Sequence, residues 1–204
     1  MDKTTKLLGG WGYIAFIVLG IFGGFLGPVA FLSIVGAIIV VIAYVRAAGE
    51  YNRPEIRTNA IISLVLGIAA IVVFIVFIGA SVVGLIFHHT TGGLAGFTGG
   101  MIAGGIITWI LWILSTWFWY RASAALGEAS GQSLFKTGGL LIFIGAITII
   151  VFGLGGIVCL IGEILLTVGF FSTPDKVQAQ QAGVAPSAFP PSPPPASPTV
   201  PPAV

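Results

Sequence analysis

The lysines and arginines of this chain all lie in alternate connections between long apolar runs. They are Lys3 and Lys6 before the first run, Arg46, Arg53 and Arg57 after the second, Arg121 and Lys136 around the fourth connection, and Lys176 after the last. Cytoplasmic segments of membrane proteins carry such an excess of basic residues. The sequence therefore predicts a chain that crosses the cell membrane several times, with both termini in the cytoplasm.

The composition argues against a water-soluble fold. Hydrophobic residues make up 57% of the chain and charged residues 7%, whereas globular proteins contain about 25% charged residues. The net charge of +2 is divided among short connections, so it forms no basic patch of the kind that binds nucleic acid. We expect the lipid bilayer, and no nucleic acid, as the partner of these charges.

Two of the apolar runs are too long for one membrane crossing. Residues 9–46 would reach about 57 Å as a single helix, against a hydrocarbon core of about 30 Å. A Gly-Pro pair at 27–28 interrupts this run, and a glycine cluster at 153–156 interrupts the run from 138 to 171. Because glycine and proline favour turns, each run is predicted to fold into a hairpin of two short helices.

We predict an all-α integral membrane protein, a six-span helical bundle of three antiparallel hairpins followed by a disordered tail. The transmembrane helical domain is assigned to residues 1–172 and the tail to residues 173–204. The spans are predicted at about residues 9–26, 28–46, 59–87, 101–120, 138–152 and 157–171. The uncharged stretch 88–100 could be a loop, a re-entrant segment or part of the fourth helix, and the sequence leaves this open.

The tail is rich in proline, alanine and serine. Nine of the twelve prolines lie between Pro186 and Pro202, and such a segment buries too little apolar surface to fold. The stretch 190–195 is expected to be extended polyproline II, with the PxxP spacing that proline-binding domains recognise. We favour a tail without a dedicated partner, and a proline-motif-binding partner is the alternative.

Six aromatic residues lie near the predicted cytoplasmic ends of the helices. They are Trp11, Tyr13, Tyr44, Trp117, Trp119 and Tyr120. Tryptophan and tyrosine rings favour the lipid headgroup level, so we interpret these residues as an interfacial belt. Ordinary packing inside the bundle is the alternative for each of them.

The connection before the fifth span carries the most distinctive pattern of the chain. It reads Tyr120-Arg121-x-Ser123, then Leu126-x-Glu128-x-x-Gly131, then Phe135-Lys136-Thr137, with Gly131 placed to stop a helix. The pattern resembles the prokaryotic membrane proteins grouped as domain of unknown function 996, over about residues 6–175. This chain departs by having alanine at 124, where a bulkier aromatic is usual. The resemblance implies an uncharacterised multi-pass membrane protein and carries no activity, cofactor or site.

Glu163 is the one acid inside an apolar run. It lies about 12 Å along a helix from Phe171, and a charge near mid-bilayer costs at least about 2.5 to 3.5 kcal/mol. The carboxyl group must therefore be neutral, paired or hydrated. We favour a structural hydrogen bond to Thr148, Ser115 or another polar group of the helices. The alternative is a proton or cation relay.

Two pairs of glycines have the small-xxx-small spacing that lets helices approach closely. Gly20 and Gly24 lie in the first span, and Gly100 and Gly104 lie at the start of the fourth. We expect these faces to pack within one chain. A homo-oligomer could use the same faces.

No catalytic, cofactor-binding or metal-binding motif accompanies these features. His88 and His89 are adjacent, and consecutive side chains on a helix diverge by about 100°, which is poor geometry for sharing a metal. Cys159 is interpreted as a small buried apolar residue. We expect a non-enzymatic protein with a structural or interaction role through helix packing. The alternative is a small transporter or channel with Glu163 in a proton or cation pathway.

Overall fold

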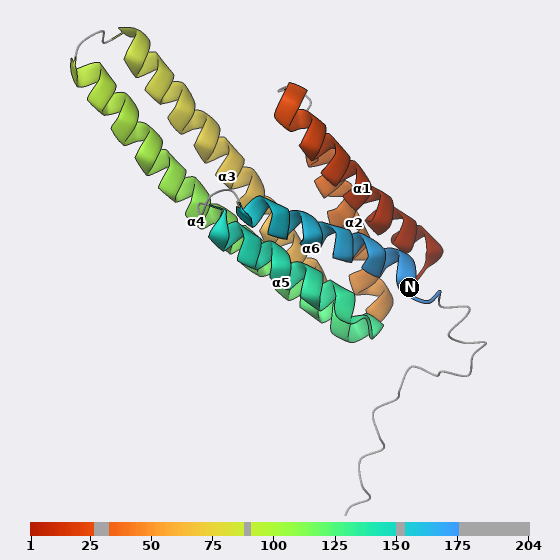
Figure 1. Ribbon diagram of the computed structural model, residues 1–204. Helices are drawn as coiled ribbons and strands as arrows, with labels where there is room; N and C mark the ends of the chain where they lie inside the picture. The colour runs from red at the N-terminus through yellow and green to blue at the C-terminus, as the bar shows by residue number, and fades with distance from the viewer. Residues whose placement is uncertain (27–32, 88–90, 150–153, 176–204) are drawn as a thin grey trace, which may run out of the picture. The chain divides into compact units, whose positions relative to one another are not determined.

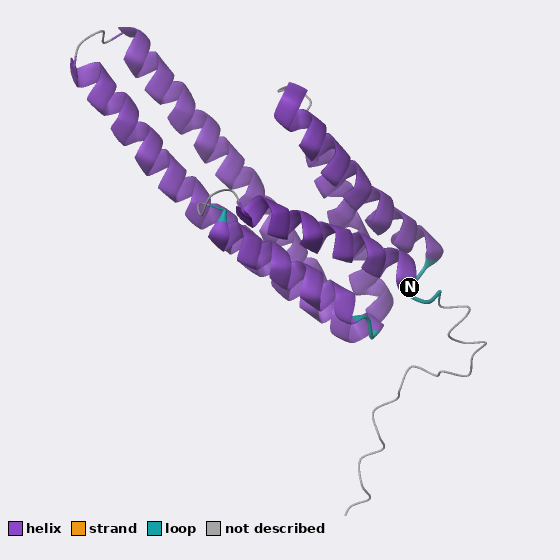
Figure 2. Cartoon of the chain, viewed as in Figure 1, coloured by secondary structure: helices purple, strands orange, loops and turns teal. Residues whose placement is uncertain are grey.

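The computed structural model describes residues 1–26, 33–87, 91–149 and 154–175, with the backbone alone at 22–26, 84–87 and 91–96. In these ranges every regular element is an α-helix (Figures 1 and 2). The helices are α1 (Lys3–Leu26), α2 (Ser33–Tyr51), α3 (Pro54–Phe87), α4 (Thr91–Ser130), α5 (Ser133–Thr148) and α6 (Leu154–Ser172). The all-α prediction is confirmed. The Gly-Pro break at 27–28 and the tail from residue 176 onward lie outside the described residues.

Most of the described helices are long and apolar enough to cross a membrane. They are α1, α2, α3, α4 and α6, whereas α5 has 16 residues and is about 24 Å long. With 34 and 40 residues, α3 and α4 reach about 51 and 60 Å, well beyond a hydrocarbon core of about 30 Å. Residues 91–100, left open by the sequence, are helical and belong to α4. The chain is a multi-pass membrane protein.

Two helices end in the same local way, with a residue in the left-handed region. Asn52 has φ 54° after α2, and Gly131 has φ 72° after α4. In each turn the next N–H bonds a carbonyl five residues back, Arg53 to Ala48 at 2.9 Å and Gln132 to Gly127 at 3.1 Å. This pattern is the Schellman cap of helix C-termini. The prediction that Gly131 stops the helix is confirmed.

The helices contact one another in a closed ring. Each helix packs against the next in sequence, α6 also packs against α1, and α2 additionally contacts α4. The three strongest pairs are α3 with α4, α5 with α6 and α1 with α2, and Figure 1 shows each of them as a hairpin. The predicted hairpin pairing of helices is therefore present in the described residues.

The core lies at one end of the ring, where α1, α3 and α5 begin and α2, α4 and α6 end. We call this the basic end, because the lysines and arginines of the described chain lie there. Its fully buried side chains include Tyr44, Ile56, Leu126, Phe135, Leu166 and Phe170. Away from this end, side chains such as Val65 and Val72 of α3 and Ile102 of α4 are more than half exposed. Such an apolar exterior suits contact with lipid.

Helices α5 and α6 meet backbone to backbone through four glycines. A Cβ built on Gly138 would lie 2.8 Å from the Gly162 carbonyl oxygen, and one on Gly145 would lie 2.7 Å from that of Gly155. The two glycines on each helix are seven residues apart, which is two turns and hence one face. The small-xxx-small spacing of four residues does not include these pairs, and Gly155 was predicted to lie in a turn, so the contact was not predicted.

Replacing Gly162 with alanine should separate α5 from α6. The new Cβ would lie 2.7 Å from the Gly138 carbonyl oxygen, and overpacking of this kind costs about 1 to 3 kcal/mol. We expect a lower apparent unfolding temperature in detergent for Gly162→Ala. Gly156→Ala is the matched control, because no atom lies within 4 Å of a Cβ at that position. Equal unfolding temperatures for both variants would contradict the close contact.

Candidate functional site

Glu163 lies in the middle of α6, with a partly buried side chain. The preceding residue, Gly162, faces α5, and one residue further on a helix turns the side chain by about 100°. The Glu163 carboxyl group is close enough to Tyr13 of α1 and to Cys159 of α6 to interact electrostatically with both. The acid therefore lies on the side of α6 that packs against α1.

The two named hydrogen-bond partners expected for Glu163 are used elsewhere. The Thr148 hydroxyl donates to the Ile144 carbonyl of its own helix at 2.9 Å, and the Ser115 hydroxyl donates to the Ser63 carbonyl of α3 at 2.8 Å. Neither hydroxyl is hydrogen-bonded to the Glu163 carboxyl group, so the two named bonds are absent from the described residues. Thr148 uses a carbonyl one turn back on its own helix, as threonine on a helix commonly does, whereas Ser115 joins α4 to α3.

Among the described residues, the Glu163 side chain makes no hydrogen bond and no ion pair. Its backbone carbonyl accepts a hydrogen bond from the Thr167 hydroxyl at 2.8 Å, so the residue's one polar contact involves the main chain. Acidic side chains within a membrane helix usually pair with another polar group or face a hydrated space. Glu163 is thus an acid at the α1–α6 contact whose carboxyl group makes no hydrogen bond to a described residue.

A buried hydrogen-bonded group lies next to Glu163, and we call it the tyrosine cluster. It consists of Tyr13 of α1, Tyr44 of α2, and Trp119 and Ser123 of α4. The Tyr44 and Ser123 hydroxyl oxygens are 2.9 Å apart, and the Trp119 indole N–H donates to the Tyr13 hydroxyl at 3.0 Å. The two tyrosine oxygens are 3.4 Å apart. The cluster joins three helices through groups that would be costly to bury unpaired.

The interfacial belt predicted from the aromatic residues is wrong for the two tyrosines of the cluster. Tyr13 is 3% exposed and Tyr44 is 0% exposed, so neither ring lies at the lipid headgroups. Trp11 and Trp117, at 61% and 41% exposed, are on the outside, as a belt requires. A position near a helix end does not determine which face of the helix a ring occupies. Here the two tyrosine hydroxyl groups are hydrogen-bonded to other side chains inside the bundle.

The distinctive pattern around Ser123 packs the third hairpin onto the cluster. Ser123, Leu126 and Phe135 are fully buried, and a Cβ on Gly139 of α5 would lie 2.7 Å from the Ser123 Cβ. The Phe170 ring of α6 lies 5.0 Å from that of Phe135 and 5.6 Å from that of Tyr44. The pattern therefore has a structural role at the junction of four helices.

The glycines predicted to pack have different surroundings. A Cβ on Gly100 would lie 2.7 Å from the Ser81 hydroxyl oxygen, and Gly104 lies directly against the Phe77 side chain, so both face α3. Nothing lies within 4 Å of a Cβ at Gly20. The surroundings of Gly24 are not among the described parts of the structure. In the first hairpin the close contact is instead at Gly36, where a Cβ would lie 2.7 Å from the backbone of Phe16.

The described part of the chain contains no group of three or more His, Cys, Asp or Glu side chains that could hold a metal. His88 and His89 lie outside that part. Cys159 is partly buried, and its thiol lies 3.5 Å from the Ile142 carbonyl oxygen across the α5–α6 contact. It is a packing residue of the glycine contact.

The family described as "Protein of unknown function (DUF996)" matches residues 32–164. The chain belongs to the DUF996 family. The match includes Tyr44, Ser123 and Glu163 but not α1, which contributes Tyr13. The chain is also similar to the uncharacterized protein MJ1644 of Methanocaldococcus jannaschii, with 29% identity over 178 residues, 87% of this chain and 96% of that protein. No solved structure matches this chain.

The hydrogen bond between Tyr44 and Ser123 can be tested with a double-mutant cycle in this DUF996 protein. We expect Tyr44→Phe and Ser123→Ala each to destabilise the fold, and the double variant to cost less than the sum. The coupling should be about 0.5 to 1.5 kcal/mol, the net value of one buried hydrogen bond. Tyr120→Phe is the control, because among described residues its hydroxyl makes no hydrogen bond. Strict additivity in unfolding measurements would contradict the bond.

Proposed function

We propose that this DUF996-family protein is a non-enzymatic protein of the cell membrane that acts through the fixed packing of its helices. The observation that carries the proposal is the tyrosine cluster, in which the polar side chains bond one another and are at most partly exposed. Groups arranged in this way hold helices in place and are not directed at a substrate. The role that follows is structural, or one of interaction through the surface that the packing creates.

The topology is part of the same proposal. The basic end carries exposed cations on several helices, among them Arg46, Arg57, Arg121 and Lys136. Basic connections remain on the cytoplasmic side during insertion, so both termini are assigned to the cytoplasm.

The proposed topology predicts the side from which two residues can be labelled. In a Cys159→Ala background, single cysteines at Arg57 and Lys136 should react with a membrane-impermeant maleimide in inside-out vesicles and not in right-side-out vesicles. Both positions are exposed and lie in the first turns of different helices, α3 and α5. The Cys159→Ala chain without an added cysteine is the control. Labelling in right-side-out vesicles alone would reverse the topology.

A second function, a proton or cation pathway through Glu163, is favoured by one specific observation. The Glu163 carboxyl group has no hydrogen-bond donor among the described residues and lies near the Tyr13 hydroxyl. An acid kept at membrane depth without a structural partner is a functional candidate. Against this reading, ion pathways are usually lined by more than one acidic or polar group, and Glu163 is the only acid within α6.

Glu163→Gln separates the two functions. Under the packing proposal, the variant should match the wild type in unfolding temperature and in the proton permeability of liposomes that contain it, since the neutral amide has nearly the same shape. Permeability is read from an entrapped pH-sensitive dye after a pH step. Glu128→Gln, at an exposed position of the basic end, is the control. A wild-type proton flux that Glu163→Gln abolishes and Glu128→Gln preserves would establish the pathway instead.

A further inference from the structure

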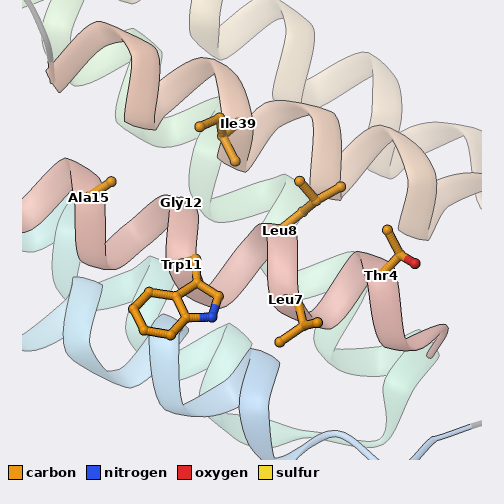
Figure 3. A pocket seen from close by; sticks show the side chains of 7 residues that line it. All are labelled: Thr4, Leu7, Leu8, Trp11, Gly12, Ala15 and Ile39. Carbon is orange, nitrogen blue, oxygen red and sulfur yellow. The ribbon is translucent and has the colours of Figure 1, made fainter.

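A groove of about 520 Å³ runs along α1 and α2 near the basic end (Figure 3). Its walls are mainly apolar, with Leu7, Leu8, Trp11 and Ala15 from α1 and Ile39 from α2. Thr4 is the one hydroxyl-bearing residue of the lining and lies at the end of the groove nearest the N-terminus. The Trp11 ring is 61% exposed. The groove therefore opens outward from the bundle.

The groove is as long as one leaflet is deep. Thr4 and Ala15 are eleven residues apart on α1, which corresponds to about 16 Å along the helix. Half of a hydrocarbon core of about 30 Å is about 15 Å. The Thr4 end is at the basic end of the bundle, since the neighbouring Thr5 hydroxyl donates to Glu50 at the end of α2. An acyl chain of the leaflet at the basic end can thus lie along the whole groove.

A cation lies at the same level as the Thr4 end. Gly12 of α1 lies against Val40 of α2. Because the two helices are antiparallel, moving six residues forward along α2 to Arg46 corresponds to moving about six residues back along α1. Arg46 is therefore level with the turn between Thr4 and Leu8. Arg46 also follows Ile39 by seven residues, or two turns, and hence shares its face of α2. Its side chain is exposed.

Arg46 has no acidic partner among the described residues, in contrast to Arg53, which pairs with Glu55 at 3.0 Å. A guanidinium group binds phosphate through two parallel hydrogen bonds. The exposed Lys3 lies one turn before Leu7 on α1 and adds positive charge at this level. The mouth of the groove therefore combines cations and a hydroxyl, whereas its length is apolar.

We propose that this groove binds one anionic phospholipid of the cytoplasmic leaflet, with an acyl chain along Leu8, Trp11 and Ala15 and the phosphate at Arg46 and Thr4. The choice of the cytoplasmic leaflet rests on the proposed topology, whereas the site rests on the groove and the charges at its mouth. Charge complementarity favours this occupant, because cytoplasmic leaflets are rich in anionic lipids.

Native mass spectrometry of the full chain, released from detergent micelles, tests the site. With phosphatidylglycerol added in titration, we expect the wild type to retain one lipid through mild activation, and to retain zwitterionic phosphatidylcholine at least threefold less. Arg46→Gln should lower phosphatidylglycerol retention at least threefold. Arg121→Gln is the matched control, because this exposed arginine lies on α4, away from the groove, and it should retain the lipid as the wild type does.

Ala15→Phe tests the acyl-chain part of the site with all charges in place. The added ring should fill the groove and lower phosphatidylglycerol retention while the unfolding temperature stays near that of the wild type. Equal losses in Arg46→Gln and Arg121→Gln would overturn the proposal in favour of general surface charge. Unchanged retention in both Arg46→Gln and Ala15→Phe would also overturn it. A dimer that Ala15→Phe dissociates, in place of a lipid adduct, would assign the groove to a second copy.

Discussion

The bond between Tyr44 of α2 and Ser123 of α4 is the interaction on which the rest of the bundle depends. It links residues 79 positions apart and joins α2 to α4, two helices that are not neighbours in the ring. In an apolar surrounding an unpaired hydroxyl group is costly. Apolar helix faces, in contrast, gain little free energy by contacting one another instead of lipid. Polar pairing and close glycine contacts therefore determine how these helices are arranged.

The glycine contact between α5 and α6 connects this packing to the candidate site. Gly162 holds α6 against the backbone of α5, and this orientation turns the next residue, Glu163, toward Tyr13. Gly138 and Gly139 lie one turn after Phe135 near the start of α5. Gly138 contacts α6 and Gly139 contacts Ser123 of α4, so one short stretch of α5 contacts both helices. The position of the one acid of α6 is thus a consequence of small residues on a different helix.

Several features could be predicted from local sequence because their causes are local. The lengths of the apolar runs require helices that fold back, and Gly131 stops α4 because glycine adopts the left-handed conformation without strain. The family resemblance rested on a short pattern of which Ser123, Leu126 and Phe135 are buried together. The faces of Tyr13 and Tyr44 and the partners of Thr148 and Ser115 could not be predicted in this way. The contact of Gly138 and Gly145 with α6 could not be predicted either.

The sequence by itself determined the membrane class, the helices and their hairpin order, since these depend on hydropathy, turn residues and the placement of charge. Only the tertiary structure decided that two tyrosines face inward, that Glu163 has no hydrogen-bond partner in the described chain, and that a groove runs beside Trp11. In a chain that is apolar on nearly every face, periodicity cannot distinguish lipid from interior. The face that each residue presents is set by which helices lie beside it.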